Sequence, residues 1–182
     1  RVTNIYRRDE GGWKIVHHHT DPASAMTGVG RSPGLISTGK VVEPAMPARR
    51  MRVCIYGGTA LEKEPAAFIA ALTYQILVSM PAVIVTGGFR HSNNAPLAVS
   101  TDVAALNGAR RFAIDHGIDL RGIYEAWVPE LDSRPDVGGA VRLDETDGIT
   151  LRVMPGRTPL GRRLAMVAGV DLVVTISGKT HT

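Results

Sequence analysis

The chain has 182 residues, enough for one domain with a hydrophobic core or for one domain and an appendage. Aromatic residues make up only 5%, and small and aliphatic residues dominate, which favours an α/β fold with buried parallel strands over a β-sandwich. The net charge of +4 comes from arginines spread along the sequence, so a nucleic-acid partner, which usually requires a clustered basic stripe, is not expected.

The cellular setting is inferred from what the sequence lacks. No apolar run reaches the roughly 20 residues of a membrane span, and no signal-peptide pattern is present, so we expect a cytoplasmic protein without membrane contact. The single cysteine, Cys54, lies in an expected strand, and we expect a buried core residue rather than a reactive thiol. Because the sequence starts at Arg1 and ends at Thr182, directly after a strand and loop, we expect a fragment of a longer protein.

Residues 1–22 predict a β-hairpin with its turn at Gly11-Gly12. Three consecutive histidines, His17, His18 and His19, fall in its second strand. Since neighbouring strand residues face opposite sides, and a zinc site would need further ligands from elsewhere, we predict no metal site there.

The hairpin resembles the last two strands of SnoaL-like domains in the ketosteroid isomerase and NTF2-like superfamily, on the run VTNIYRR followed by GGWKIVHHH. Most of such a domain would lie upstream, so the resemblance implies no isomerase chemistry for this chain. Residues 23–50 are rich in Gly, Pro, Ser and Thr, a composition typical of a flexible linker. A second domain is therefore expected over residues 51–182.

Strands and helices are predicted to alternate from Met51 onward. Residues 52–56 predict a strand, and a helix is expected from Glu64-Pro65, with a core-facing stripe every four residues at Phe68, Leu72, Ile76 and Met80. Residues 82–86 are apolar throughout, as expected for a strand that is covered on both faces.

The second half continues the alternation. Ser100-Thr101-Asp102 is a good helix start, and we expect a buried stripe at Val103, Leu106, Ala109 and Ala113. Further strands are predicted over 120–124, 150–153 and 171–176, with a helix over 159–167. The predicted fold is a Rossmann-like open parallel sheet with helices on both faces, truncated at the C-terminus, plus the N-terminal hairpin.

Three glycine-containing loops each follow a predicted strand: Gly57-Gly58-Thr59, Gly87-Gly88-Phe89 and Ser177-Gly178-Lys179-Thr180. In a parallel sheet they would share the carboxyl edge, where open α/β sheets bind ligands. Glycine lets backbone amides approach a phosphate, and a helix N-terminus adds positive potential. Tight turns are the alternative explanation for each loop taken singly. The three loops together favour a nucleotide site.

Two better-known phosphate motifs do not match. The run Gly178-Lys179-Thr180 has the end of a P-loop, but the required leading glycine is replaced by Val173. No strand is followed by G-x-G-x-x-G, the fingerprint of dinucleotide-dependent dehydrogenases. Nucleotide triphosphatase and dehydrogenase functions are therefore not favoured.

Residues 51–182 resemble the SLOG superfamily. The resemblance rests on RRLAM at 162–166, DLVVTI at 171–176 and SGKTHT at 177–182, with VCIYGGT at 53–59 and VIVTGGF at 83–89. The superfamily includes LONELY GUY-type phosphoribohydrolases, lysine-decarboxylase-like proteins and sensor domains for ADP-ribose-type nucleotides. Lys179 and His181 depart from the hydrolases' glycine-rich motif, and the position of their catalytic glutamate would fall beyond Thr182.

The resemblance therefore implies a nucleotide-binding sensor domain, for ADP-ribose or an adenosine nucleotide, with no cofactor and no assigned catalytic residue. One alternative is a phosphoribohydrolase that cleaves nucleoside 5'-monophosphates, which requires a carboxylate near the sugar. Another is a non-catalytic structural module. The resemblance also implies a homodimer.

The candidate binding residues fall into three chemical groups. Backbone amides of the glycine loops would bind phosphate, threonine hydroxyls would add donors, and Arg162 or Lys179 would supply positive charge. Phe89 or Trp127 could stack on a base, with burial in the core as the alternative, and Arg163 is expected to be a solvated helix residue. The predicted nucleotide-binding set is Gly57, Gly58, Thr59, Gly87, Gly88, Phe89, Thr101, Arg162, Gly178, Lys179 and Thr180.

Overall fold

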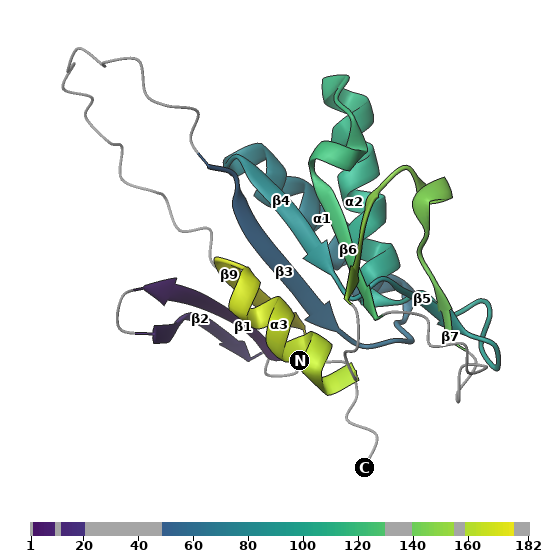
Figure 1. Ribbon diagram of the computed structural model, residues 1–182, viewed down its shortest axis with the longest axis horizontal. Helices are drawn as coiled ribbons and strands as arrows, with labels where there is room; N and C mark the ends of the chain where they lie inside the picture. The colour runs from purple at the N-terminus through teal and green to yellow at the C-terminus, as the bar shows by residue number, and fades with distance from the viewer. Residues whose placement is uncertain (1, 10–11, 21–48, 130–139, 155–158, 177–182) are drawn as a thin grey trace, which may run out of the picture.

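The computed structural model, which describes residues 2–9, 12–20, 49–129, 140–154 and 159–176, contains a mostly parallel seven-stranded sheet flanked by helices (Figure 1). The strand order is β2-β1-β9-β3-β4-β6-β8. The strands are β1 (Val2–Asp9), β2 (Gly12–Thr20), β3 (Met51–Gly57), β4 (Ala82–Thr86), β6 (Tyr124–Pro129), β8 (Thr150–Met154) and β9 (Leu172–Ile176). Strands β9, β3, β4, β6 and β8 are parallel, which confirms the predicted Rossmann-like α/β class.

Helices cover both faces of this sheet (Figure 1). α1 (Lys63–Ser79) and α2 (Thr101–His116) pack on one face, and α3 (Pro159–Gly169) packs on the other. α2 starts as its sequence predicts, because the Ser100 hydroxyl oxygen accepts the Val103 N–H (3.1 Å), and it ends at Gly117 with a left-handed φ of 62°. None of the described helices is both long and apolar enough to cross a membrane.

The two faces of the sheet have separate cores. The larger core combines α1 and α2 with Val53, Ile55, Ile84 and Val174 from the sheet. The smaller core lies under α3 and includes Cys54, which is buried as predicted.

The stripe predicted for α1 is wrong at Phe68, whose exposed fraction is 52%, whereas Ile69 is fully buried. The buried residues of α1 are Ile69, Thr73, Ile76 and Leu77. A strict four-residue spacing drifts by about 40° per step around a helix of 3.6 residues per turn, so a stripe anchored at Ile76 no longer includes Phe68 two steps earlier. In α2 the predicted Leu106, Ala109 and Ala113 are buried.

The strand predicted over 120–124 is also wrong. Residues 120–122 form the short 3-10 helix η1 (Leu120–Gly122), because the Asp119 carboxylate accepts the Arg121 N–H (3.0 Å) and caps the turn. The strand starts only at Tyr124. A small second sheet of β5 (Phe89–Ser92) and β7 (Ala140–Arg142) was not predicted. The last predicted helix and strand are confirmed as α3 and β9.

The N-terminal hairpin is confirmed, and it belongs to the same sheet as the rest of the chain. β1 pairs antiparallel with β2 and, on its other side, antiparallel with β9. Ile5 packs against the larger core and Tyr6 against the smaller one. The division into a hairpin, a linker over 23–50 and a domain over 51–182 stays a prediction, and residues 23–48 lie outside the described part of the chain.

Candidate functional site

The strand order reverses direction at β3. From β3 the chain passes through α1 to β4, which pairs with β3 on one side. The strand that pairs with β3 on the other side, β9, comes later in the chain and follows α3, which covers the opposite face of the sheet. The carboxyl ends of β3 and β9 lie level, since Gly57 pairs with Ile176. Open α/β sheets bind their ligands at such a topological switch point, outside the carboxyl ends of the strands.

The loop after β3 is held from the side by the start of α2. The N–H and the hydroxyl of Thr101 both donate to the Gly58 carbonyl oxygen (3.0 Å each), and the Leu61 N–H donates to the Val99 carbonyl (2.8 Å). A Cβ at Gly57 would lie 2.5 Å from the Thr101 hydroxyl oxygen and 2.7 Å from the Ile176 carbonyl. Close packing therefore requires glycine at position 57 whether or not a phosphate binds there.

The N-terminus of α1 faces this same edge and differs from that of α2. The residue before α1, Glu62, makes no side-chain capping hydrogen bond, whereas Ser100 caps α2. Within the described residues, the amides of Lys63 and Glu64 have no capping acceptor, and Pro65 has no N–H. Uncapped amides at a helix N-terminus carry partial positive charge and suit an anion.

The glycine loop after β4 has a different construction. Gly88 has φ 69°, and a Cβ there would lie 2.6 Å from Val128 Cγ1. Its N–H donates to the Thr86 hydroxyl oxygen (3.4 Å), and its carbonyl accepts the Leu143 N–H (2.8 Å). The next amide, of Phe89, donates to an Asp102 carboxylate oxygen (2.7 Å). The amides of Gly88 and Phe89 are therefore bound by the protein itself.

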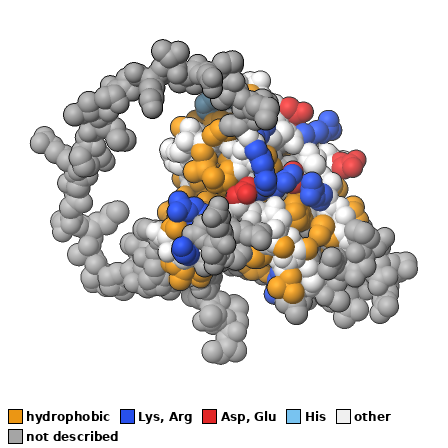
Figure 2. Space-filling model, turned by 60° about the vertical axis from the view of Figure 1, so that its left-hand side comes forward, with side chains coloured by type: hydrophobic (Ala, Val, Ile, Leu, Met, Phe, Trp, Pro, Cys, Tyr) orange, Lys and Arg blue, Asp and Glu red, His pale blue; other side chains and the backbone are white. Residues whose placement is uncertain are grey.

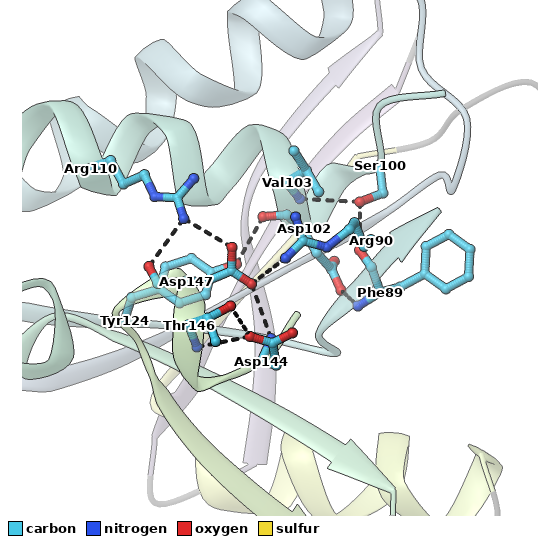
Figure 3. A network of polar contacts seen from close by, with 10 residues as sticks. All are labelled: Phe89, Arg90, Ser100, Asp102, Val103, Arg110, Tyr124, Asp144, Thr146 and Asp147. Carbon is cyan, nitrogen blue, oxygen red and sulfur yellow. Dashed lines mark hydrogen bonds and ion pairs between the residues drawn. The ribbon is translucent and has the colours of Figure 1, made fainter. Parts of the chain in front are cut away.

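A buried tyrosine, Tyr124, forms hydrogen bonds with residues next to this loop (Figure 3). The Tyr124 hydroxyl, on a fully buried side chain, donates to the Asp102 carbonyl (2.8 Å) and lies 2.9 Å from the Thr86 hydroxyl. Since Tyr124 has one hydroxyl hydrogen, the Thr86 hydroxyl must be the donor in the second bond. Burial, and then the nearby Asp102 carboxylate, raise the pKa of Tyr124 well above 10.0, so this network keeps its proton at neutral pH.

A second set of contacts ties the segment before β8 to α2 (Figure 3). The buried Asp147 carboxylate binds the guanidinium groups of Arg90 from β5 and Arg110 from α2 (3.0 Å to Arg110). It also accepts the Asp144 N–H (3.0 Å). Hydrogen bonds from Thr146 to the Asp144 carboxylate lower the pKa of that carboxyl group. These bonds hold the segment before β8 beside the loop after β4. Neither the composition nor the residue spacing of the sequence predicted them.

Among the described side chains of α3, that of Arg163 lies beside the end of β3. Its guanidinium carbon lies 5.5 Å from the ring centre of Tyr56, the residue immediately before Gly57, and its side chain is otherwise exposed. Arg162 lies in the same turn of α3, but its side chain is outside the described residues. The sequence signal was the Arg162-Arg163 pair itself; it did not show that Arg163 lies against Tyr56.

The remaining predicted residues separate into three groups. Thr59 is exposed and Phe89 is half-buried at the carboxyl edge, where a ligand could reach them. Trp127 is a core residue, with its indole N–H donating to a Glu125 carboxylate oxygen (2.9 Å), so its alternative assignment to the core is confirmed. Gly178, Lys179 and Thr180 lie outside the described residues.

The opposite, amino edge of the sheet carries paired charges. Arg52 and Arg152 lie 3.6 Å from the two carboxylate oxygens of Glu125, and Arg49 lies 3.4 Å from Asp171. Figure 2 shows basic and acidic side chains next to one another on the face turned forward. The fold thus brings together arginines that are far apart in the sequence, each beside a carboxylate, at the edge away from the switch point.

No group of three or more His, Cys, Asp or Glu residues that could hold a metal ion occurs in the described part of the chain. A scan of the sequence against protein-family models finds no match, and a search of curated proteins finds none either.

Proposed function

We propose that this chain is a nucleotide-binding sensor domain, which binds an ADP-ribose or adenosine-type nucleotide at the carboxyl ends of β3 and β9. The observation that carries the proposal is the topological switch point at β3, with the uncapped N-terminus of α1 directly after its loop. The ligand phosphate would lie between the Gly58–Thr59 backbone and the first amides of α1.

The chemistry available on the two sides of this edge of the sheet suits a phosphate. On one side the amides of Lys63 and Glu64 have no capping acceptor among the described residues, and on the other the exposed Arg163 guanidinium lies against Tyr56. A guanidinium offers several N–H donors in a planar fork that matches phosphate oxygens. The buried hydrogen bonds of Gly88 and Phe89 move the expected phosphate away from β4 and towards β3.

The amide contribution is tested with a matched pair of variants, Lys63→Pro and Lys63→Ala. Proline is well tolerated at the first position of a helix, and Glu62, with φ −71° and ψ 166°, already has the extended conformation that a following proline requires. Both variants remove the lysine charge, but only Lys63→Pro removes the N–H. If that amide binds phosphate, Lys63→Pro binds ADP-ribose roughly ten- to a hundredfold more weakly than Lys63→Ala, as expected for a hydrogen bond to a charged group.

The same titrations include Arg163→Ala, with Arg111→Ala on the outer face of α2 as the control for general loss of positive charge. We expect weaker binding only for Arg163→Ala. Equal affinities of Lys63→Pro and Lys63→Ala, together with an unaffected Arg163→Ala, would place the phosphate elsewhere and contradict the proposal. Circular dichroism and thermal melting check that each variant is folded.

A further inference from the structure

The outer face of α1 lacks the charged side chains that a solvent-facing helix normally carries. From Pro65 to Met80 the sequence contains no Asp, Glu, Lys or Arg. The exposed fractions of Phe68 and Val78 on this face are nevertheless 52% and 51%. A surface helix usually has polar and charged residues opposite its buried stripe, and a helix that is apolar all round is usually buried. The outer face of α1 is therefore suited to contact with another apolar protein surface.

A groove of about 370 Å³ lies between α1 and α2 beside this face. Ala67, Ala70 and Ala71 of α1 and Gly108 of α2 are among the residues that line it. The two helices are in close contact at Gly108, where a Cβ would lie 2.2 Å from the Ala70 carbonyl oxygen. Small residues on both helices leave room for a large side chain of a partner, and aromatic side chains seated in such recesses contribute much of the energy of protein interfaces.

The groove offers little net charge to a partner. Arg111 is the one charged residue among the described residues that line it. Its Nε lies 3.7 Å from an Asp115 carboxylate oxygen, and its guanidinium carbon lies 5.3 Å from the ring centre of Tyr74. A nucleic acid or an acidic peptide would gain little electrostatic attraction here, and two copies of the surface would not repel each other. The charge pattern therefore favours a second copy of the chain over a charged partner.

The position of Phe68 relative to the groove suits a symmetric pair. At about 100° per residue, Phe68 lies on one side of the outermost line of α1, which runs through Ala71 and Val78, and Ala67 lies on the other side, towards the groove. Because Phe68 and Ala67 are adjacent in sequence, they lie at nearly the same height along the helix. A two-fold axis parallel to α1 would therefore place Phe68 of each copy over the groove of the other. A closed two-fold interface requires such a self-complementary surface.

The surface is also large enough for a specific contact. α1 has 17 residues and is therefore about 25 Å long, and packed helices lie about 8–10 Å apart. The joint outer face of α1 and α2 thus measures roughly 500 Å² per copy, or about 1,000 Å² in a pair, the size at which specific interfaces begin. We propose that two copies of the chain associate through the outer faces of α1 and α2, with Phe68 of each copy inserted into the groove of the other. This pairing does not depend on the nucleotide site, which is proposed at the carboxyl edge of the sheet.

Sedimentation velocity over a concentration series tests the pairing with Phe68→Lys and a matched control, Leu164→Lys. Both substitutions place a charge at an exposed apolar position of a helix, but Leu164 belongs to α3, which covers the opposite face of the sheet. We expect the unsubstituted chain and Leu164→Lys to form dimers with the same dissociation constant. Loss of one aromatic anchor typically weakens an interface about thirtyfold, and the symmetric pair contains two, so Phe68→Lys should weaken the dimer at least about a hundredfold.

Ala67→Gln tests the groove itself, because it fills the recess with an uncharged side chain that helices tolerate well, at an exposed position. We expect this variant to weaken the dimer too. A chain that stays monomeric at about 100 μM overturns the inference. A dimer that tolerates Phe68→Lys or Ala67→Gln, or that Leu164→Lys weakens equally, overturns it as well. Circular dichroism checks that each variant keeps its helices, and none of these outcomes bears on the nucleotide site.

Discussion

The buried hydroxyl of Tyr124 gives the sharpest test of how the carboxyl edge is supported. Tyr124→Phe removes one oxygen from a fully buried side chain and leaves its ring in place. Two hydrogen bonds disappear, to the Asp102 carbonyl (2.8 Å) and to the Thr86 hydroxyl (2.9 Å). Because both partners stay buried, we expect the free energy of unfolding to fall by about 1–3 kcal/mol, the usual range for leaving buried polar groups unpaired.

Equilibrium urea unfolding measures this difference from the shift of the midpoint at unchanged slope. Tyr74→Phe is the matched control, because its hydroxyl bonds Asp115 (3.0 Å) at an exposed position where water can replace the lost partner. We expect a much smaller change for Tyr74→Phe. Equal losses in the two variants, or a Tyr124→Phe protein as stable as the unsubstituted one, would refute the argument that this buried network holds the loop after β4.

Two further predictions concern the same region. The pKa of Tyr124 is raised above 10.0 in the folded chain, so the stability that its hydroxyl contributes is present below pH 10.0 and is lost as the pH rises above that value. The difference in unfolding free energy between the unsubstituted chain and Tyr124→Phe should therefore shrink in urea titrations at alkaline pH. A difference that stays constant with pH would contradict this. Gly88→Ala places a Cβ 2.6 Å from Val128 on a residue with a left-handed φ, and we expect it to lower the free energy of unfolding by about 2–4 kcal/mol. Gly117 also has a left-handed φ but open space around it, so in thermal melts Gly117→Ala should lower the free energy of unfolding by only about 1–2 kcal/mol. Similar losses would mean that the contact with Val128 is unimportant.

The alternation of strands and helices could be predicted because each element carries a local pattern. The apolar run at 82–86 and the Ser100 cap of α2 are visible in the sequence and present in the fold. Local competition explains the strand predicted too early at 120–124, where the Asp119 side chain stabilises a turn. No local pattern could show that β1 pairs with β9, since the two are separated by most of the chain.

The sequence predicted where the glycine loops lie, and the binding role of these loops stays a prediction. Glycines after β3 and β4 correctly marked the carboxyl edge, yet the structure gives both a packing role, at Gly57 against Thr101 and at Gly88 against Val128. The same sequence signal arises from close packing and from phosphate binding, so it cannot distinguish them. The position of Arg163 beside Tyr56 depends on how α3 crosses the sheet, which a pair of adjacent arginines does not encode.

The most direct test of the central claim is calorimetric titration of the chain with AMP, ADP-ribose and cyclic ADP-ribose, followed by chromatography of the cell contents for released base. A nucleotide-binding sensor domain predicts saturable binding of at least one of these ligands, recovered intact. Release of the base would make the chain an N-glycosidic hydrolase, and the absence of saturable binding by all three nucleotides would contradict the account.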